Sequence, residues 1–377
     1  MREVVIIGAG IHKFGRWTEK PFAELGKVAI VNALKDAGVD WKDVQACYAG
    51  SAFQGMGAGH NVCRQVGETG IPIFNLEQAC GSGSAGMQLG YQSIASGQFD
   101  VVCGVGFEKQ SRGTIPGESF PMWAREMGLG SYIGWHGATA QHHMHEYGTT
   151  IEMLAHVSVI SHRHAALCPD AAYTNMGNLT IEDVLKSRMI GYPVTLYMVG
   201  PANDGAAAII MCAKEVAHKY SQKKPVTIVD TTFSTTVYDT RECRYRESGR
   251  KENEICAKRL YEATGIGPED MDVVHCGNQF CIEEIEYAEA LGFCKEGEGG
   301  KFIWEGNTEL GGKVPFNTDG SHISRGNALG ANGIAGIVEL TRQLRGECGD
   351  RQVNGAKVAL AQSSGAGQNV FLTILKR

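Results

Sequence analysis

Apolar and polar positions along this chain follow strand and helix patterns in alternation. Short runs rich in Val, Ile and Ala predict strands at 4–10, 100–106, 225–233 and 356–367. Such runs are typical of strands that are buried on both faces of a sheet. Segments 80–100 and 330–350 each begin with small residues and continue as an amphipathic helix. The pattern therefore predicts an α/β protein.

The same order of elements occurs twice. Residues 33–53 run from a helix end through a glycine turn and an acidic loop into an apolar strand, and residues 260–280 repeat this plan. The segments at 80–100 and 330–350 then correspond in the same order. The matched positions of the first repeat are Gly38 with Gly265, Gly50 with Gly277, and Phe53 with Phe280. We interpret this as an internal duplication.

Each copy reads β-α-β-α-β, and the stretch between the copies has no counterpart. We expect an N-terminal half at 1–110 and 196–222, an inserted loop domain at 111–195, and a C-terminal half at 223–377. The expected architecture is two similar α/β halves packed together, with the insertion covering one face.

Composition limits the partners. The formal charge of −6 gives no electrostatic reason to expect nucleic acid or an anionic membrane as the main partner. No apolar run reaches transmembrane length, and the first run meets Gly8 too early for a signal peptide, so we expect a cytoplasmic protein. The third glycine of a dinucleotide fingerprint is absent after Gly8 and Gly10, because Lys13 stands there.

Cys80 is the candidate nucleophile. It lies between an extended segment and a helix that starts with small residues, where the helix dipole and free backbone N–H groups can lower a thiol pKa and bind an oxyanion. The alternative is a buried structural cysteine beside a tight helix pairing. The insertion's histidines do not predict a metal site, because no acidic or cysteine ligand set accompanies them in sequence. They are His142, His143, His145, His156, His162 and His164.

The chain resembles the thiolase superfamily over essentially its whole length. The resemblance rests on the Cys80 segment NLEQACGSGSAG, the duplicated halves and the insertion. HMHEYGTT at 143–150, PANDGAAAII at 201–210 and EALGFCKEGEGG at 289–300 resemble the sterol-carrier-type thiolases. This implies a layered α/β/α/β/α thiolase fold and a cysteine that accepts an acyl group and passes it to coenzyme A. It also implies a homodimer core and a small partner subunit with zinc-ribbon and OB-fold modules.

Three motifs of the family are altered here. The GHP-like motif reads Gly326-Asn327-Ala328, so Asn327, which can donate to an oxyanion but cannot act as a base, replaces a histidine. The NEAF or HDCF motif reads Gly277-Asn278-Gln279-Phe280, and we expect Asn278 or the nearby His275 to take the oxyanion role. The alternative is that His275 is a buried strand residue whose ring nitrogens have hydrogen-bond partners in the core.

The CxG-like motif reads Ser363-Ser364-Gly365, so a weakly acidic hydroxyl replaces the second cysteine. The backbone N–H groups of Gly365 and Cys80 still suit an oxyanion hole, since this needs no side chain. His322, five positions before Asn327, is the candidate replacement base, and its alternative is a surface loop histidine.

These changes favour thiolytic cleavage of a branched or aromatic β-ketoacyl-CoA. A chain that combines the sterol-carrier-type segments with these altered motifs resembles the thiolases that cleave benzoylsuccinyl-CoA. This resemblance implies benzoyl-CoA and succinyl-CoA as products. Coenzyme A is then a co-substrate, and no permanently bound cofactor or metal is expected. No residue is assigned to the coenzyme phosphates. The alternatives are a biosynthetic acetoacetyl-CoA thiolase or ketoacyl synthase relative, and a non-catalytic acyl-CoA-binding scaffold.

Overall fold

A nine-stranded sheet organises the chain. The computed structural model describes residues 1–111, 120, 122–220, 222–236, 249–366 and 369–377. Within them the strand order is β3-β2-β4-β7-β1-β8-β11-β10-β9. The strands are β1 Val4–Gly15, β2 Ala46–Gly50, β3 Ile73–Leu76, β4 Val101–Glu108, β7 Asp204–Ala213, β8 Val226–Ser234, β9 Val273–His275, β10 Val358–Gly365 and β11 Asn369–Lys376.

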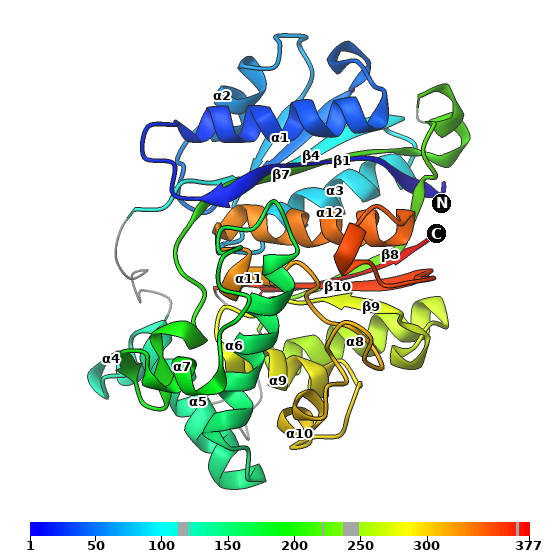
Figure 1. The fold of residues 1–377 in the computed structure, drawn as a ribbon. Helices are drawn as coiled ribbons and strands as arrows, with labels where there is room; N and C mark the ends of the chain where they lie inside the picture. Colours follow the sequence, from blue (N-terminus) through cyan, green and yellow to red (C-terminus); the bar gives the residue numbers. More distant parts are fainter. Residues whose placement is uncertain (112–119, 121, 221, 237–248, 367–368) are drawn as a thin grey trace.

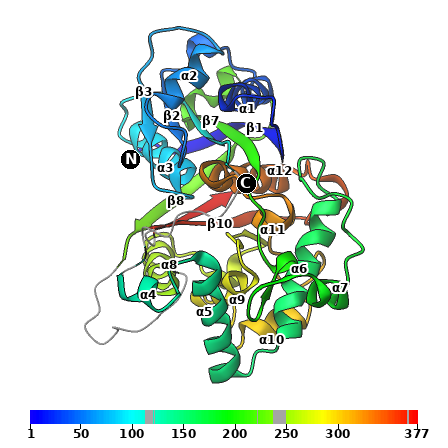
Figure 2. The same cartoon turned by 90° about the vertical axis from the view of Figure 1, so that its left-hand side faces the viewer.

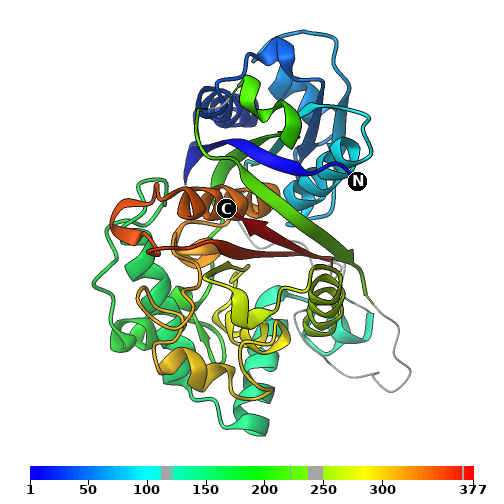
Figure 3. The ribbon, with the colours of Figure 1, turned by 90° about the vertical axis from the view of Figure 1, so that its right-hand side faces the viewer.

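The sheet divides between β1 and β8 into two stacked parts. Only three residue pairs join these strands, from Val4 with Ile228 to Ile6 with Val226. Two helices lie between the two parts, and others cover the outer faces, which makes five layers (Figure 1). The central helices are α3 Ser82–Ala95 and α12 Asn332–Arg345, and the outer ones include α1 Phe22–Ala37, α2 Ala58–Arg64, α8 Arg250–Thr264 and α9 Cys281–Ala290. Figure 3 shows α12, in orange, between the blue β1 and the red C-terminal strands.

The predicted duplication is confirmed. The order β1-β7-β4-β2 has the same parallel and antiparallel pairings as β8-β11-β10-β9. Gly38 and Gly265 both end their helix in the left-handed region at φ 66°, as glycine at this position allows. Each copy has one strand beyond the predicted β-α-β-α-β unit, β7 in the first copy and β11 in the second. β7 is an almost unbroken run of Ala, Ile and Met that could equally well have been a buried helix.

Both faces of the sheet pack against hydrophobic layers. Along β1, Val4 and Ile6 pack into the central layer with α12, whereas Val5 and Ile7 pack under α1. This arrangement explains why the strands are continuously apolar instead of alternating with polar residues.

The start of α3 and the end of β4 meet the backbone of the segment before α12 through glycine. A Cβ added to Gly83 of α3 would lie 2.5 Å from the carbonyl oxygen of Gly330, and one added to Gly106 of β4 would lie 2.3 Å from the same oxygen. Glycine is therefore needed at both positions, because backbone leaves no space for a methyl group. This contact holds the start of α3 next to the segment that leads into α12.

The inserted segment is mainly helical. It contains α4 Met122–Glu126, α5 Tyr132–Tyr147, α6 Ile151–Ala166, α7 Ile181–Lys186, the small β5 Met189–Gly191 and β6 Val194–Thr195. α6 packs against α9, α10 Gly299–Trp304 and α11 Ser321–Ser324 of the second copy (Figure 2). In the described part of the chain, no helix has both the length and the apolar character that a membrane span requires.

Replacing Gly106 by alanine should destabilise the fold by about 1–3 kcal/mol, because the new Cβ meets an immovable backbone oxygen. Gly104→Ala is the matched control on the same strand, since its Cβ would have only ordinary contacts with Ile209 and Ile334, at 3.4 and 3.7 Å. Urea unfolding of both variants measures the difference. Equal losses of stability would contradict the proposed contact.

Candidate active site

Cys80 follows a tight turn at the start of α3. Ala79, directly before it, has a left-handed backbone with φ 49°. The Ser82 hydroxyl closes the turn, donating to the Ala79 carbonyl oxygen (2.6 Å) and accepting from the Gln78 N–H (2.9 Å). Strained non-glycine residues of this kind cost about 1–3 kcal/mol and occur most often at functional sites. The predicted junction between an extended segment and a helix is confirmed.

The Cys80 thiol lies in surroundings that disfavour the thiolate. Burial raises the pKa of the Cys80 thiol to about 12, and the negative charges of Glu108 and Glu283 contribute to this shift. The backbone N–H groups of Ala366 and Cys80 oppose it. The expectation that the helix start lowers this pKa is therefore wrong, because desolvation outweighs the N–H groups. At neutral pH the thiol is protonated and needs a base.

Gly365 lies against the Cys80 turn. A Cβ on Gly365 would be 2.4 Å from the Gln78 carbonyl oxygen and 3.3 Å from the Cys80 nitrogen. The backbone N–H that interacts with the Cys80 thiol, however, belongs to Ala366. The structure thus places the end of β10 at the Cys80 turn, and the N–H group that contacts the thiol is one residue after Gly365.

His322 is buried in α11, so the surface-loop alternative is wrong. A Cβ on Gly277 would lie 3.1 Å from His322 Cε1, so the ring occupies space that a side chain at position 277 would fill. Burial, together with the charges of Arg325 and His275, lowers the pKa of His322 well below its ordinary value. Its imidazole is therefore neutral at pH 7 and has one unprotonated ring nitrogen. Gly277 also donates its N–H to Gln362 of β10, the strand that ends at the Cys80 turn.

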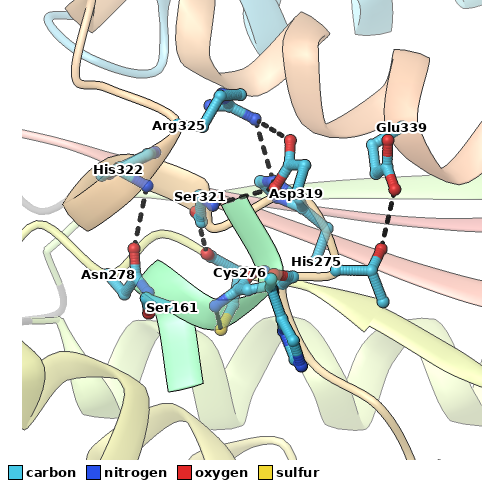
Figure 4. A network of polar contacts seen from close by, with 12 residues as sticks. Ser161, His275, Cys276, Asn278, Asp319, Ser321, His322, Arg325 and Glu339 are labelled. Atoms are coloured by element: carbon cyan, nitrogen blue, oxygen red, sulfur yellow. Dashed lines mark hydrogen bonds and ion pairs between the residues drawn. The ribbon is translucent and has the colours of Figure 1, made fainter. Parts of the chain in front are cut away.

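Asn278 holds the α11 turn in place. Its Nδ2 donates to Glu284 Oε2 (2.8 Å) and Ser161 Oγ (3.1 Å), and its Oδ1 accepts from the N–H groups of His322 (2.9 Å) and Ile323 (3.2 Å). Figure 4 shows Asn278 between Ser161 and His322. Both amide hydrogens are used, which leaves no donor for an oxyanion.

His275 belongs to a buried charge cluster. Its Nε2 lies 3.2 Å from Asp319 Oδ1 and 3.0 Å from Arg325 Nη1, and Arg325 also donates to Asp319 at 2.6 Å (Figure 4). A Cβ on Gly336 would be only 2.5 Å from His275 Nδ1, so the ring packs tightly on α12. These contacts agree with the alternative of a satisfied core residue instead of the oxyanion role.

Asn327 is oriented by the start of α12. Asn332 Nδ2 donates to Asn327 Oδ1 (2.6 Å), and Asn332 Oδ1 accepts from the Ala328 N–H (3.0 Å). This fixes the amide so that Asn327 Nδ2 points away from Asn332. Among the described residues, Asn327 Nδ2 has no hydrogen-bond acceptor. The group therefore suits donation to a ligand.

Asn327 lines a cavity of about 400 Å³ between the inserted segment and the two halves. The wall is mostly apolar and includes the aromatic rings of Tyr132, Tyr173, Tyr197 and Phe280. Cys80 does not line it. This volume is sufficient for a small organic ligand.

Two segments connect the cavity with the surroundings of Cys80. Phe280, on the cavity wall, donates its N–H to Glu283, whose charge raises the pKa of Cys80. Gly330, three residues after Asn327, donates its N–H to Glu108, which acts on the same thiol. Neither carboxylate is predicted by the sequence motifs, although Glu108 stands out as the charged end of an apolar strand.

Several histidines of the insertion pair with carboxylates of the C-terminal half. His143 lies 3.1 Å from Glu289, and His136 lies 3.2 Å from Glu283. Sequence alone did not reveal these partners, because they are more than 140 residues away. Among the residues that the structure describes, no group of three or more His, Cys, Asp or Glu could hold a metal ion.

Comparison with protein families gives two matches. Residues 4–176 match the model of the thiolase N-terminal domain. Residues 243–377 match the thiolase C-terminal domain-like model.

Curated relatives align over nearly the whole chain. The benzoylsuccinyl-CoA thiolase subunit BbsB of Thauera aromatica is 36% identical, with 97% of this chain and 95% of the relative covered. An acetyl-CoA acetyltransferase of Methanothermobacter thermautotrophicus is 33% identical over the full length of both chains. Human sterol carrier protein 2 is 32% identical over all of this chain and 72% of its own length.

Solved structures share the fold. The Ltp2-ChsH2(DUF35) aldolase has a TM-score of 0.87 at 26% identity, with 99% of this chain and 97% of that chain covered. Human mitochondrial 3-ketoacyl-CoA thiolase has a TM-score of 0.74 at 18% identity, covering 100% and 98%, which supports the fold alone. Because its two halves match both thiolase domains and its relatives exceed 30% identity over nearly the whole chain, this protein belongs to the thiolase family.

Proposed function

We propose that the protein is an acyl-CoA C-acyltransferase that cleaves a β-ketoacyl-CoA by thiolysis. The observation that carries this proposal is the Cys80 turn, in which a nucleophile faces backbone N–H groups at the end of β10. His322 and Asn327 supply a neutral base and an amide donor on the neighbouring loop.

In the proposed reaction, His322 accepts the Cys80 proton as the sulfur attacks the keto carbon. The N–H groups of Cys80 and Ala366 stabilise the oxyanion that forms. The bond between the keto carbon and the α-carbon then breaks, its electron pair stays on the α-carbon, and this product takes a proton to become an acyl-CoA. Coenzyme A attacks the acyl-Cys80 thioester, transfers its thiol proton to the enzyme, and releases the second acyl-CoA. Coenzyme A is thus a co-substrate, and no permanently bound cofactor is needed.

The aromatic cavity supports a bulky acyl group. Its rings offer the flat contacts that a phenyl group prefers, and its volume of about 400 Å³ exceeds what an acetyl group needs. A relative at 36% identity is a benzoylsuccinyl-CoA thiolase subunit. We therefore propose benzoylsuccinyl-CoA or a close analogue as substrate, with benzoyl-CoA and succinyl-CoA as products. Ser363, in place of the second cysteine, argues against a biosynthetic thiolase.

A partner subunit is also part of the proposal. The relative BbsB is a subunit, and the aldolase neighbour is described together with a DUF35 component. We propose a homodimer core that associates with a small zinc-ribbon and OB-fold protein.

The structural likeness to an aldolase favours a second candidate function. Its TM-score of 0.87 exceeds that of the thiolase neighbour, 0.74. An aldol-type cleavage would need no acyl-cysteine. A scaffold without activity is the remaining alternative, and it predicts an unreactive Cys80. The first experiment separates these possibilities.

Exposure of the purified chain to benzoyl-, succinyl- and acetyl-CoA should add an acyl group to Cys80, and intact-protein mass detects it. Cys80→Ser should lose the adduct while keeping the native fold, because the hydroxyl is nearly isosteric but a poor nucleophile. Cleavage of substrate without any adduct, unaffected by Cys80→Ser, would favour the aldolase. The absence of both adduct and cleavage, with a small partner subunit restored, would favour the scaffold.

Alkylation of Cys80 by iodoacetamide should rise about tenfold for each pH unit up to pH 10, because burial raises the pKa of this thiol to about 12. In the urea-unfolded chain the rate should level off above pH about 8.5, the ordinary thiol value. Peptide mass spectrometry measures both rates. A plateau below pH 9 in the folded protein would contradict the raised pKa.

Asn327→Asp should lower kcat by about 100- to 1000-fold, because it replaces the amide donor by a carboxylate of the same shape. The contact from Asn332 to the remaining oxygen is retained. A change in KM alone would indicate that Asn327 only binds substrate. Acylation of Cys80 by benzoyl-CoA checks that the variant is folded.

A further inference from the structure

The cavity contains a buried histidine that the proposed mechanism does not use. His162 lies on α6 and lines the cavity wall together with Asn327. Its Nδ1 is 2.9 Å from the carbonyl oxygen of Ser158, one turn earlier on the same helix. Since a carbonyl oxygen only accepts, Nδ1 carries the hydrogen. In the neutral ring, Nε2 is then an unprotonated nitrogen on the opposite edge.

The surroundings keep this ring neutral. Burial lowers the pKa of His162, and the bond to Ser158 only partly offsets this effect. Among the described residues, no donor is bonded to Nε2. The same wall therefore has a hydrogen-bond donor, Asn327 Nδ2, and a basic nitrogen, His162 Nε2, in otherwise mostly apolar surroundings.

This combination suits one kind of proton transfer. A donor that stabilises an enolate oxygen, together with a base that faces the adjacent carbon, is what removal of a proton α to a thioester carbonyl requires. Ser363 is too weak an acid or base for that step. Glu108 and Glu283 are held by backbone N–H groups, from Gly330 and Phe280 respectively.

We infer that His162 is the residue that exchanges the α-carbon proton of the acyl-CoA product, an inference that rests on the proposed function. When an acyl-CoA occupies the cavity, Nε2 takes the α-proton, and the electron pair of the C–H bond moves into the enolate, whose oxygen is bound by Asn327. In the cleavage direction His162 takes a proton from solvent and donates it from Nε2 to the α-carbon of the enolate that C–C bond breakage leaves. Solvent supplies the next proton to Nε2, and the coenzyme A thiol gives its proton to His322, which by then has released the Cys80 proton to solvent and later returns a proton to the Cys80 sulfur.

The division of roles separates two histidines. His322 serves the sulfur, and His162 serves the carbon. The two proton transfers can therefore be disabled one at a time.

The test is deuterium exchange without net cleavage. The protein is incubated with succinyl-CoA or acetyl-CoA in D₂O, and mass spectrometry follows deuterium at the α-carbon. His162→Gln should slow exchange by at least about 100-fold, while benzoylation of Cys80 by benzoyl-CoA continues. His156→Gln is the control, because this histidine lies on the same helix but faces Glu309 and Trp304 outside the cavity. The His156→Gln variant should exchange the α-proton of the acyl-CoA at the wild-type rate.

The inference would be overturned if His162→Gln exchanged the α-proton at the wild-type rate. It would also be overturned if exchange were lost in His322→Gln but not in His162→Gln. If His162→Gln fails to accept a benzoyl group, His162→Asn replaces it, with the same two outcomes. A wild-type protein that exchanges α-protons through His162 but never forms an adduct would contradict the proposed thiolase reaction and retain the role of His162.

Discussion

The close contact between α3 and α12 is the constraint on which the rest of the structure depends. Both helices are enclosed between the two parts of the sheet (Figure 1). They approach each other at their N-terminal ends through glycine. The carbonyl oxygen of Gly330 occupies the space that side chains on Gly83 and Gly106 would need. Because the helices cannot separate or shift there, the turn that carries Cys80 and the loop that carries Asn327 must lie at the same end of the central layer.

The loop at 317–327 is the second device that fixes the site, and it is strained. Asn317 and Ser321 have φ of 52° and 40°, values that ordinary residues adopt at a cost of about 1–3 kcal/mol. Buried polar contacts offset this cost: Asn317 bonds Glu284, Thr318 bonds Glu339, and Asp319 pairs with Arg325. Asn278 adds two bonds to the backbone of α11. Asn278, which motif position predicts as an oxyanion donor, thus holds the backbone of His322 in place.

The extent to which the sequence predicted the molecule follows from the range of each interaction. The duplication, the layered fold and the Cys80 turn are encoded locally, in periodicity, in glycine positions and in a few consecutive residues. The roles of His275 and Asn278 depend on partners such as Asp319 and Glu284, which motif position does not specify. The raised pKa of Cys80 depends on burial and on Glu283, about 200 residues away. The cavity arises from segments of both halves and the insertion, so no single stretch of sequence could indicate it.

The duplication also gives a physical reason for the division of chemistry between the halves. In the correspondence of 80–100 with 330–350, Cys80 matches Gly330, and Asn327 lies three residues before that position, so both residues stand just before the central helix of their copy. In each copy a side chain ties the turn to the helix start, Ser82 in the first and Asn332 in the second. Since the glycine contact brings these two helix starts together, one ancestral helix start can supply the nucleophile in one copy and an oxyanion donor in the other. Both positions can then change chemically without moving the backbone, because the contacts that hold each turn do not depend on the side chain of Cys80 or on the Nδ2 group of Asn327.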